Sequence, residues 1–225
     1  MNHVRAVLFD AGGTLIHMDG ERASLAAGIP HDDAAFGRAY EAALEEMRRW
    51  VLTHPRSTDR ERMPLFLEAI LAGLGVPEAE RRRAADAIAA EHRRANLWSR
   101  SAEDAPEVLE ALRGRGYRLA VISNADGRVR GLVERAGLAG FFEFVVDSAE
   151  IGVEKPDPRI FEAAAIRLDL PPSACAYVGD IYEIDVLGAR AAGLEAILIG
   201  RGEAPAGVRR VATLTELLGF FTGCS

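Results

Sequence analysis

The apolar residues of this chain follow two different patterns, and each pattern occupies its own part of the sequence. Between about residues 20 and 95, apolar side chains recur at helical spacing with Glu and Arg between them, and no strand-like alternation occurs. Before and after that block, short runs of consecutive apolar residues alternate with amphipathic segments. The chain therefore combines an all-helical block with a part in which strands and helices alternate.

Three amphipathic helices are predicted within the helical block. They cover residues 32–52, 59–74 and 77–94, and glycine and proline residues mark the breaks between them. Residues 16–30 carry glycines and charges without a clear period, so we expect a loop or flap there. A block of roughly 75 residues is too long for an ordinary loop, which indicates an inserted subdomain.

The remaining sequence predicts strands that alternate with helices, in the order of a βαβ fold. Apolar runs predict strands at residues 4–9, 118–123, 144–146, 175–179 and 196–199. Amphipathic segments predict helices at residues 104–113, 127–136, 159–168, 184–192 and 213–221. The fold class is therefore α/β, a Rossmann-like, doubly wound parallel sheet with an inserted all-helical subdomain.

Bulk composition narrows the classes of partner. The chain has 225 residues, and 49% of them are hydrophobic, which is enough for a sizeable core. A net charge of -7 argues against a general electrostatic grip on nucleic acid or on an anionic membrane. No apolar run approaches the ~18 residues of a membrane span, and the first residues lack a signal-peptide pattern. We therefore expect a cytoplasmic protein with a small-molecule partner and no membrane association.

The basic and sulfur-containing residues add two observations. Lysine and arginine total 27, yet Lys155 is the only lysine. An ammonium and a guanidinium fork are not interchangeable in a tight site, so a lone lysine predicts a position that needs a compact charge. The alternative is a chance surface lysine.

Cys175 and Cys224 show no metal-binding or redox spacing, and a disulfide has little support.

Polar residues follow several predicted strands at comparable positions. Asp10 follows the first strand, Ser123 and Asn124 close the second, and Asp180 follows the strand at 175–179, with Asp185 shortly after it. The carboxyl ends of parallel strands share one edge of a sheet. Three carboxylates at one cleft repel one another unless a cation compensates, and such hard oxygen ligands suit Mg²⁺ and a substrate phosphate.

The glycines after Asp10 fit an anion site at the same edge. Gly12 and Gly13 permit a positive φ or a close backbone approach, so that amides can turn toward an anion held beside Asp10. On this segment alone, the alternative is a strand capped by a solvated aspartate and followed by a Gly-Gly turn.

The order of these residues resembles the motifs of the haloacid dehalogenase superfamily of hydrolases. The matching segments are Phe9-Asp10-Ala11-Gly12-Gly13-Thr14-Leu15, Ile122-Ser123-Asn124, Glu154-Lys155-Pro156 and Val178-Gly179-Asp180-Ile181-Tyr182-Glu183-Ile184-Asp185. The resemblance covers nearly the whole chain. It implies a Rossmann-like catalytic core at residues 1–18 and 98–225 and a helical cap at residues 19–97.

The resemblance also implies a role for each motif residue. Asp10 would be the nucleophile that forms a covalent aspartyl intermediate. Thr14 and Ser123 would donate hydrogen bonds to the transferring group, and Lys155 would neutralise Asp10 and the oxyanion and orient both. The substrate-binding set would be Gly13, Thr14, Ser123, Asn124 and Lys155. The Mg²⁺ ligands would be Asp10, the backbone carbonyl of Gly12, Asp180, and Asp185 directly or through water.

One position departs from the family pattern. Family phosphatases usually carry a second aspartate two residues after the nucleophile, which acts as general acid and base, and this chain has Gly12 there. Losing a positioned acid costs on the order of 10² to 10⁴ in rate, and poor alkoxide leaving groups suffer most. His17 and His54 are the candidates to replace the acid, and solvated surface histidines are the alternative reading.

Three activities fit these residues. The retained metal acids favour a Mg²⁺-dependent phosphatase-like hydrolase that acts on a small phosphorylated metabolite. A 2-haloacid dehalogenase-like hydrolase needs no second acid, but such enzymes need no metal and typically have Ser-Asn where this chain has Gly179-Asp180. The third reading is a low-activity phosphate-binding protein in which Gly12 has removed efficient turnover. A Schiff-base hydrolase is excluded, because Lys155 is the only lysine and lies in the core motif.

Overall fold

The chain divides into two compact units. A computed structural model describes residues 3–55, 57–201 and 205–223, so Cys224 lies outside the described residues. One unit combines Met1–His17 with Arg100–Ser225, and the other is Met18–Ser99. The two chain crossings between the units run through a two-stranded sheet of β2 (Ile16–Met18) and β3 (Trp98–Ser101). No helix in the described ranges is long and apolar enough to cross a membrane.

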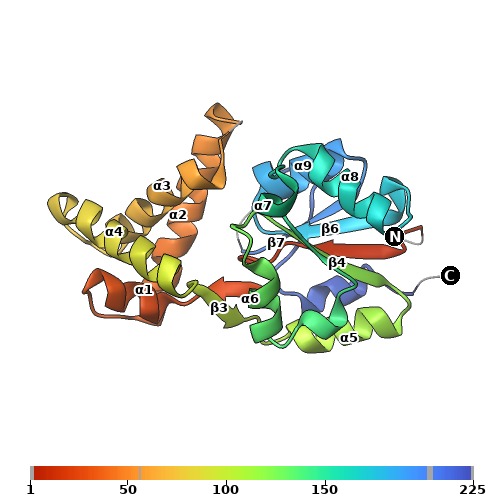
Figure 1. Cartoon of the computed structure of the whole chain (residues 1–225), viewed down its shortest axis with the longest axis horizontal. Helices are drawn as coiled ribbons and strands as arrows, with labels where there is room; N and C mark the ends of the chain where they lie inside the picture. Colours follow the sequence, from red (N-terminus) through yellow and green to blue (C-terminus); the bar gives the residue numbers. More distant parts are fainter. Residues whose placement is uncertain (1–2, 56, 202–204, 224–225) are drawn as a thin grey trace. The chain divides into compact units, whose positions relative to one another are not determined.

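The unit Met18–Ser99 is helical. Its helices are α1 (Gly20–Ala27), α2 (Asp33–Thr53), α3 (Asp59–Gly73) and α4 (Glu78–Arg94). α3 packs against both α2 and α4, and α1 packs against α4 (Figure 1). Phe36, Phe66, Ile70 and Ile88 contribute to a buried apolar cluster of this unit. The apolar residues whose helical spacing predicted the three long helices are therefore the residues that face this cluster.

The expectation of a loop at residues 16–30 is wrong, because this segment contains β2 and α1. Asp19 caps α1 by accepting a hydrogen bond from the Arg22 backbone N–H at 3.1 Å, and Gly28 ends the helix in the left-handed conformation. The Arg22 guanidinium donates to Glu91 at 2.8 Å and to the Ala95 carbonyl at 2.7 Å. Contacts with the C-terminal end of α4, rather than a strong apolar period within residues 16–30, therefore stabilise this short helix.

The second unit contains a six-stranded parallel sheet with the order β5-β4-β1-β6-β7-β8. Its strands are β1 (Ala6–Phe9), β4 (Arg118–Ser123), β5 (Val145–Asp147), β6 (Cys175–Gly179), β7 (Glu195–Ile199) and β8 (Arg209–Val211). The α-helices of this unit are α5 (Ala105–Gly114), α6 (Val129–Arg135), α7 (Ser148–Ile151), α8 (Pro158–Arg167) and α9 (Leu187–Ala191). The sheet confirms the predicted α/β, doubly wound fold class.

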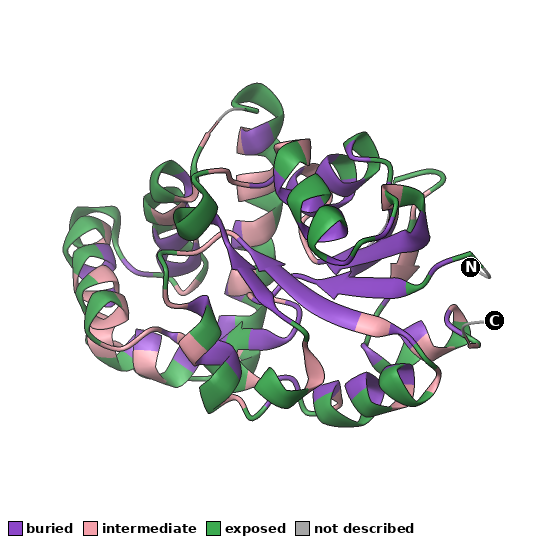
Figure 2. Ribbon diagram, turned by 45° about the vertical axis from the view of Figure 1, so that its right-hand side comes forward, coloured by how far each residue is buried: buried purple, intermediate pink, exposed green. Residues whose placement is uncertain are grey.

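Helices cover both faces of this sheet, so its central strands β4, β1 and β6 are buried except at Arg118, the first residue of β4 (Figure 2). Leu8 of β1 and Ile122 of β4 share one apolar cluster with Phe161 of α8 and Ala189 of α9. α5 and α6 lie on the opposite face (Figure 1). Burial on both sides explains why the strands appear in the sequence as continuous apolar runs rather than as alternating patterns.

Two predicted helices take a different form. Residues 184–192 were expected to be one α-helix, but a π-helical turn, η3 (Tyr182–Val186), precedes a short α9. Residues 213–221 contain only a 3-10 turn, η4 (Thr215–Gly219), which buries Leu217. Two further 3-10 turns are η1 (Ala139–Phe141) and η2 (Pro172–Ala174). In these segments tertiary contacts outweigh the helical period.

The topology places Asp10 where open α/β sheets bind ligands. β1 lies in the middle of the sheet, between β4 and β6, which come later in the chain. In the register of these strands, Phe9 is level with Val121 of β4 and Val178 of β6. The next residue, Asp10, is therefore at the carboxyl edge, and Ser123 and Asp180 lie one step beyond it on the two neighbouring strands.

Candidate active site

Three carboxylates meet at the carboxyl edge of the sheet. One carboxylate oxygen from each of Asp10, Asp180 and Asp185 lies within 4.8 Å of the others. Asp10 and Asp185 are buried, and Asp180 is half-buried. Residues that are 170 or more positions apart in the chain thus come together because β1 and β6 are neighbouring parallel strands.

Lys155 lies among these acids and is 3% exposed. Its Nζ donates to Asp10 Oδ1 at 2.6 Å, to Asp185 Oδ1 at 2.7 Å and to the Tyr177 hydroxyl at 2.9 Å. An ammonium has three N–H donors, and these three acceptors match that number. The lone lysine of the sequence is therefore a buried ion-paired residue and not a chance surface lysine.

Asn124 holds the backbone of Lys155. The Lys155 N–H donates to Asn124 Oδ1 at 2.7 Å, and Asn124 Nδ2 donates to the Lys155 carbonyl at 3.0 Å. The next residue, Ala125, exchanges backbone hydrogen bonds with the Ser148 hydroxyl at 3.1 and 3.2 Å. These paired contacts fix the loop after β4 against the segments that follow β5. Asn124 therefore positions Lys155, and its predicted contact with substrate stays a prediction.

Thr14 and Ser123 bring hydroxyl groups to this edge of the sheet. Thr14 is 1% exposed and Ser123 is 5% exposed. Thr14 Oγ1 is buried and has no hydrogen-bond partner among the described residues. Since a buried hydroxyl without a partner costs free energy, its donor is suited to a bound group.

Two glycines permit the close approach of the acids. Gly13 has a φ of +82°, and a Cβ placed there would lie 2.2 Å from Asp180 Oδ2. A Cβ at Gly179 would lie 2.4 Å from the Cγ of Asp185. Real Cβ atoms do not approach other atoms this closely, so a side chain at either position would displace an acid of the site. Gly12, by contrast, does not adopt a positive φ.

The π-helical turn sets the direction of the Asp185 side chain. The Asp185 N–H donates to the Ile181 carbonyl at 2.7 Å, and Asp185 Oδ2 accepts from the Ile181 N–H at 2.9 Å. The other oxygen, Oδ1, faces Lys155. π turns of this kind are frequent at functional sites.

The acids of the site are buried or half-buried, and the one ammonium beside them does not balance their negative charge. Burial raises the pKa of Asp10 to about 7 against the opposing effect of Lys155, and Asp185 adds to the rise. Burial and the neighbouring acids Asp185 and Asp10 raise the pKa of Asp180 well above its usual value. Burial disfavours the charge on Lys155, but Asp10 and Asp185 outweigh it and keep its pKa well above its ordinary value. The acids therefore favour a further cation.

The residues present fit a divalent cation with oxygen ligands. When all three carboxylates are ionised, one ammonium leaves two negative charges unbalanced, which is the charge that one divalent cation neutralises. Asp180 Oδ1 is buried and has no hydrogen-bond partner among the described residues. Clustered carboxylate oxygens of this kind suit Mg²⁺ better than softer metals.

The two histidines considered as a replacement acid are placed differently. His17 lies on β2, where its neighbours Ile16 and Met18 are buried and His17 itself is exposed. His54 belongs to the helical unit, where its ring stacks on Trp50 with 4.2 Å between the centroids. Among the described residues, the hydrogen bonds and ion pairs of the Lys155 cluster do not include His17. A replacement role for His17 therefore has no support in the contacts of the site.

Tyr177 belongs to the site but was missed in the sequence. It is fully buried in β6, and its hydroxyl contacts Lys155 Nζ and the Ile122 carbonyl. A tyrosine inside an apolar strand needs a hydrogen-bond partner for its hydroxyl, and this signal was available from the sequence.

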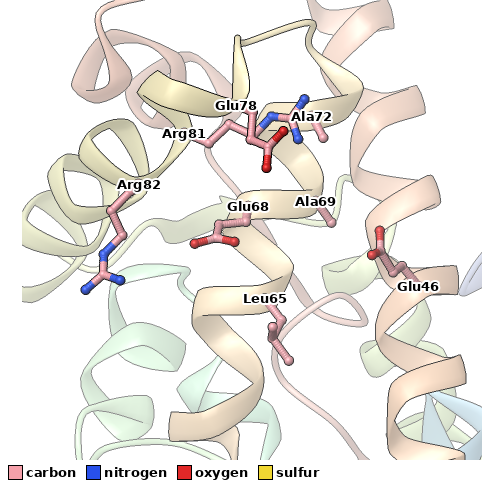
Figure 3. A pocket seen from close by; sticks show the side chains of 8 residues that line it. All are labelled: Glu46, Leu65, Glu68, Ala69, Ala72, Glu78, Arg81 and Arg82. Carbon is pink, nitrogen blue, oxygen red and sulfur yellow. The ribbon is translucent and has the colours of Figure 1, made fainter.

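The helical unit has a surface groove of its own (Figure 3). It lies over α2, α3 and α4, and its charged side chains have both signs: Glu46, Glu68, Glu78, Arg81 and Arg82. The lining contains no histidine, cysteine or hydroxyl side chain. Its glutamates are therefore the only lining side chains of a kind that commonly acts in nucleophilic or acid-base chemistry.

Comparison with known proteins gives consistent matches. A family model described as haloacid dehalogenase-like hydrolase matches residues 4–193. Glyceraldehyde 3-phosphate phosphatase of Methanopyrus kandleri is 33% identical over 210 residues, which cover 89% of this chain and 85% of that protein. Phosphoserine phosphatase of Thermus thermophilus is 36% identical over 174 residues, covering 77% of this chain and 65% of that protein.

A solved structure extends the likeness to the fold. A magnesium-bound HAD-hydrolase from Bacillus subtilis matches with a TM-score of 0.70 at 19% identity, and the match covers 97% of this chain and 98% of that one. At this identity the match supports the fold alone.

Proposed function

The chain belongs to the haloacid dehalogenase-like hydrolases, and on that premise we propose that it is a Mg²⁺-dependent phosphatase of a small phosphorylated metabolite. The observation that carries this proposal is the buried cluster in which Lys155 pairs with Asp10 beside Asp180 and Asp185. The relatives named as phosphatases support the same reaction class. Their names specify different substrates, so the proposal extends only to the class of small phosphorylated metabolite.

In this proposal, Asp10 attacks phosphorus and forms an aspartyl phosphate, while the leaving group departs with the bond electrons. Lys155 holds Asp10 Oδ1 and so orients the carboxylate for attack. Thr14 and Ser123 donate hydrogen bonds to the transferring phosphoryl oxygens. Water then attacks the phosphorus of the intermediate and releases phosphate, which regenerates the Asp10 carboxylate. Fixed donors around a developing charge account for most of the catalysis in phosphoryl transfer.

The cation in this proposal is held by Asp10, the Gly12 carbonyl and Asp180, with Asp185 as a direct or water-linked ligand. When bound, Mg²⁺ supplies positive charge that lets the substrate phosphate approach the carboxylates. Asp185 already accepts hydrogen bonds from Lys155 and the Ile181 N–H. Its main role is therefore to orient Lys155.

The first test is turnover of para-nitrophenyl phosphate with and without Mg²⁺. We expect hydrolysis with Mg²⁺ and a loss of at least about 100-fold when a chelator removes the cation, because the acids then repel the phosphate. Added Mg²⁺ should restore the rate. Undiminished phosphate release in chelator would contradict the proposal. Halide release from a short 2-haloacid in chelator would instead favour a dehalogenase.

The second test concerns Gly12. We expect Gly12→Asp to raise the turnover of an alkyl phosphate by about 10- to 100-fold, because it introduces an acid that protonates an alkoxide leaving group. The backbone at Gly12 has no positive φ that would oppose a side chain. Steady-state rates on an alkyl and an aryl phosphate measure the effect.

Gly12→Asn is the matched control, since it has the same shape and no proton to give at neutral pH. The aryl phosphate should gain less than the alkyl phosphate, because its leaving group is stable without protonation. Equal alkyl phosphate rates in the Asp and Asn variants would show that leaving-group protonation does not limit this reaction.

A further inference from the structure

The hydroxyl of Tyr177 is a buried contact point between three parts of the site. It accepts a hydrogen bond from Lys155 Nζ at 2.9 Å and donates to the Ile122 carbonyl at 3.0 Å. The Tyr177 ring packs edge-to-face on Phe161, with 4.9 Å between the ring centroids. The hydroxyl therefore joins β6, the loop that carries Lys155, and the end of β4 beside Ser123.

The single proton of the Tyr177 phenol determines the direction of these hydrogen bonds. Burial raises the pKa of Tyr177 well above its usual range, so the phenol keeps its single proton. The Ile122 carbonyl accepts that proton, since the alternative acceptor, Asp185 Oδ1, lies farther away at 3.4 Å. The hydroxyl oxygen thus presents its lone pairs to Lys155 as an acceptor.

The ammonium of Lys155 depends on this acceptor. Asp10 and Asp185 accept two of its three protons, and Tyr177 accepts the third. Without the hydroxyl, one N–H of a buried ammonium has no partner, and the ammonium can rotate away from the line to Asp10 Oδ1. A group that must orient a nucleophile loses much of its effect when it is free to rotate.

We propose that Tyr177 is a positioning residue, whose hydroxyl fixes the Lys155 ammonium against Asp10 and thereby sets the rate of the chemical step. The part of this inference that concerns rate rests on the phosphatase function proposed above. The part that concerns the ammonium rests on the contacts alone.

The single lysine allows a direct test of the ammonium. Protein labelled with ¹⁵N-lysine gives one side-chain signal, from Lys155, because the sequence has no other lysine. In Tyr177→Phe, we expect this signal to shift and its protons to exchange faster with water. We also expect kcat on para-nitrophenyl phosphate to fall by about 10-fold, the loss expected for a hydrogen bond to a charged group, with KM unchanged.

Tyr117→Phe is the matched control. Tyr117 is also buried, packs edge-to-face on Phe221, and accepts a hydrogen bond from the Gly223 N–H at 3.2 Å. This hydrogen bond does not connect Tyr117 to any residue of the Lys155 cluster. We expect this variant to keep the lysine signal, kcat and KM of the parent protein, even if its thermal midpoint falls.

The outcomes separate the two parts of the inference. An unchanged Lys155 signal in Tyr177→Phe overturns the positioning role, whatever the activity. A changed signal with unchanged kcat overturns the link to rate. If the parent protein hydrolyses no phosphate ester, the proposed function fails, and the lysine signal still decides whether Tyr177 orients the ammonium.

Discussion

Asp10→Asn is expected to reduce phosphate release by at least about 10⁴-fold, because the amide is neutral and cannot form the aspartyl phosphate. Asparagine keeps the size of the side chain, and its carbonyl oxygen still accepts the hydrogen bond from Lys155 Nζ that Asp10 Oδ1 accepts at 2.6 Å. The fold should therefore persist. Steady-state turnover of para-nitrophenyl phosphate, combined with the thermal midpoint, measures the effect.

A second buried acid provides the control for this substitution. Asp147 ends β5 and is 2% exposed, but its oxygens accept from the backbone N–H groups of Ala149 and Val129. We expect Asp147→Asn to lower the thermal midpoint and to keep turnover per folded molecule. If Asp10→Asn loses no more activity than Asp147→Asn, Asp10 is not the nucleophile.

The location of the site could be predicted because it depends on features that are local in sequence. Consecutive apolar residues identify strands that are buried on both faces, and the polar residue that follows such a strand lies at the sheet edge. Asp10 and Asp180 follow β1 and β6, and Ser123 is the last residue of β4. Parallel strands then bring the three residues to one edge, as the register confirms.

The finer geometry depends on contacts between residues that are far apart in sequence. The π turn at Tyr182–Val186 aims Asp185 at Lys155, and the helical period of that segment carries no information about this contact. Asn124 is a further case, because its side-chain amide both donates to and accepts from the backbone of Lys155, 31 positions later. Only tertiary structure decides whether such an amide faces a substrate or another loop.

Gly12 shows a different kind of limit. The sequence reveals that an acid is missing there, and the backbone of Gly12 has no positive φ that would disfavour one. Neither observation reports the leaving group of the natural substrate. The chemistry of that leaving group decides whether the missing proton limits the rate, and it is a property of the ligand rather than of the fold.

Lys155→Met is expected to reduce turnover by at least about 10³-fold and to destabilise the fold by about 3 to 5 kcal/mol, because removing one partner of a buried ion pair leaves uncompensated charge. The ammonium bonds to both Asp10 and Asp185, and all three side chains are buried. Urea unfolding in chelator measures the stability, and turnover of para-nitrophenyl phosphate measures the activity.

Two comparisons make this prediction specific. Lys155→Arg should also lose activity, because a planar guanidinium cannot donate to the three converging acceptors that surround one compact ammonium. Arg62→Met removes a cation that is 2% exposed and paired with Asp59 in the helical unit, so it should destabilise the protein without removing turnover per folded molecule.

Mg²⁺ should distinguish a charge effect from a packing effect in Lys155→Met. With the ammonium gone, the carboxylates of Asp10, Asp180 and Asp185 attract a divalent cation more strongly, so Mg²⁺ should stabilise this variant more than the parent protein. An equal or smaller gain in the urea midpoint would mean that packing around the Lys155 stem, rather than its charge, holds the acids together.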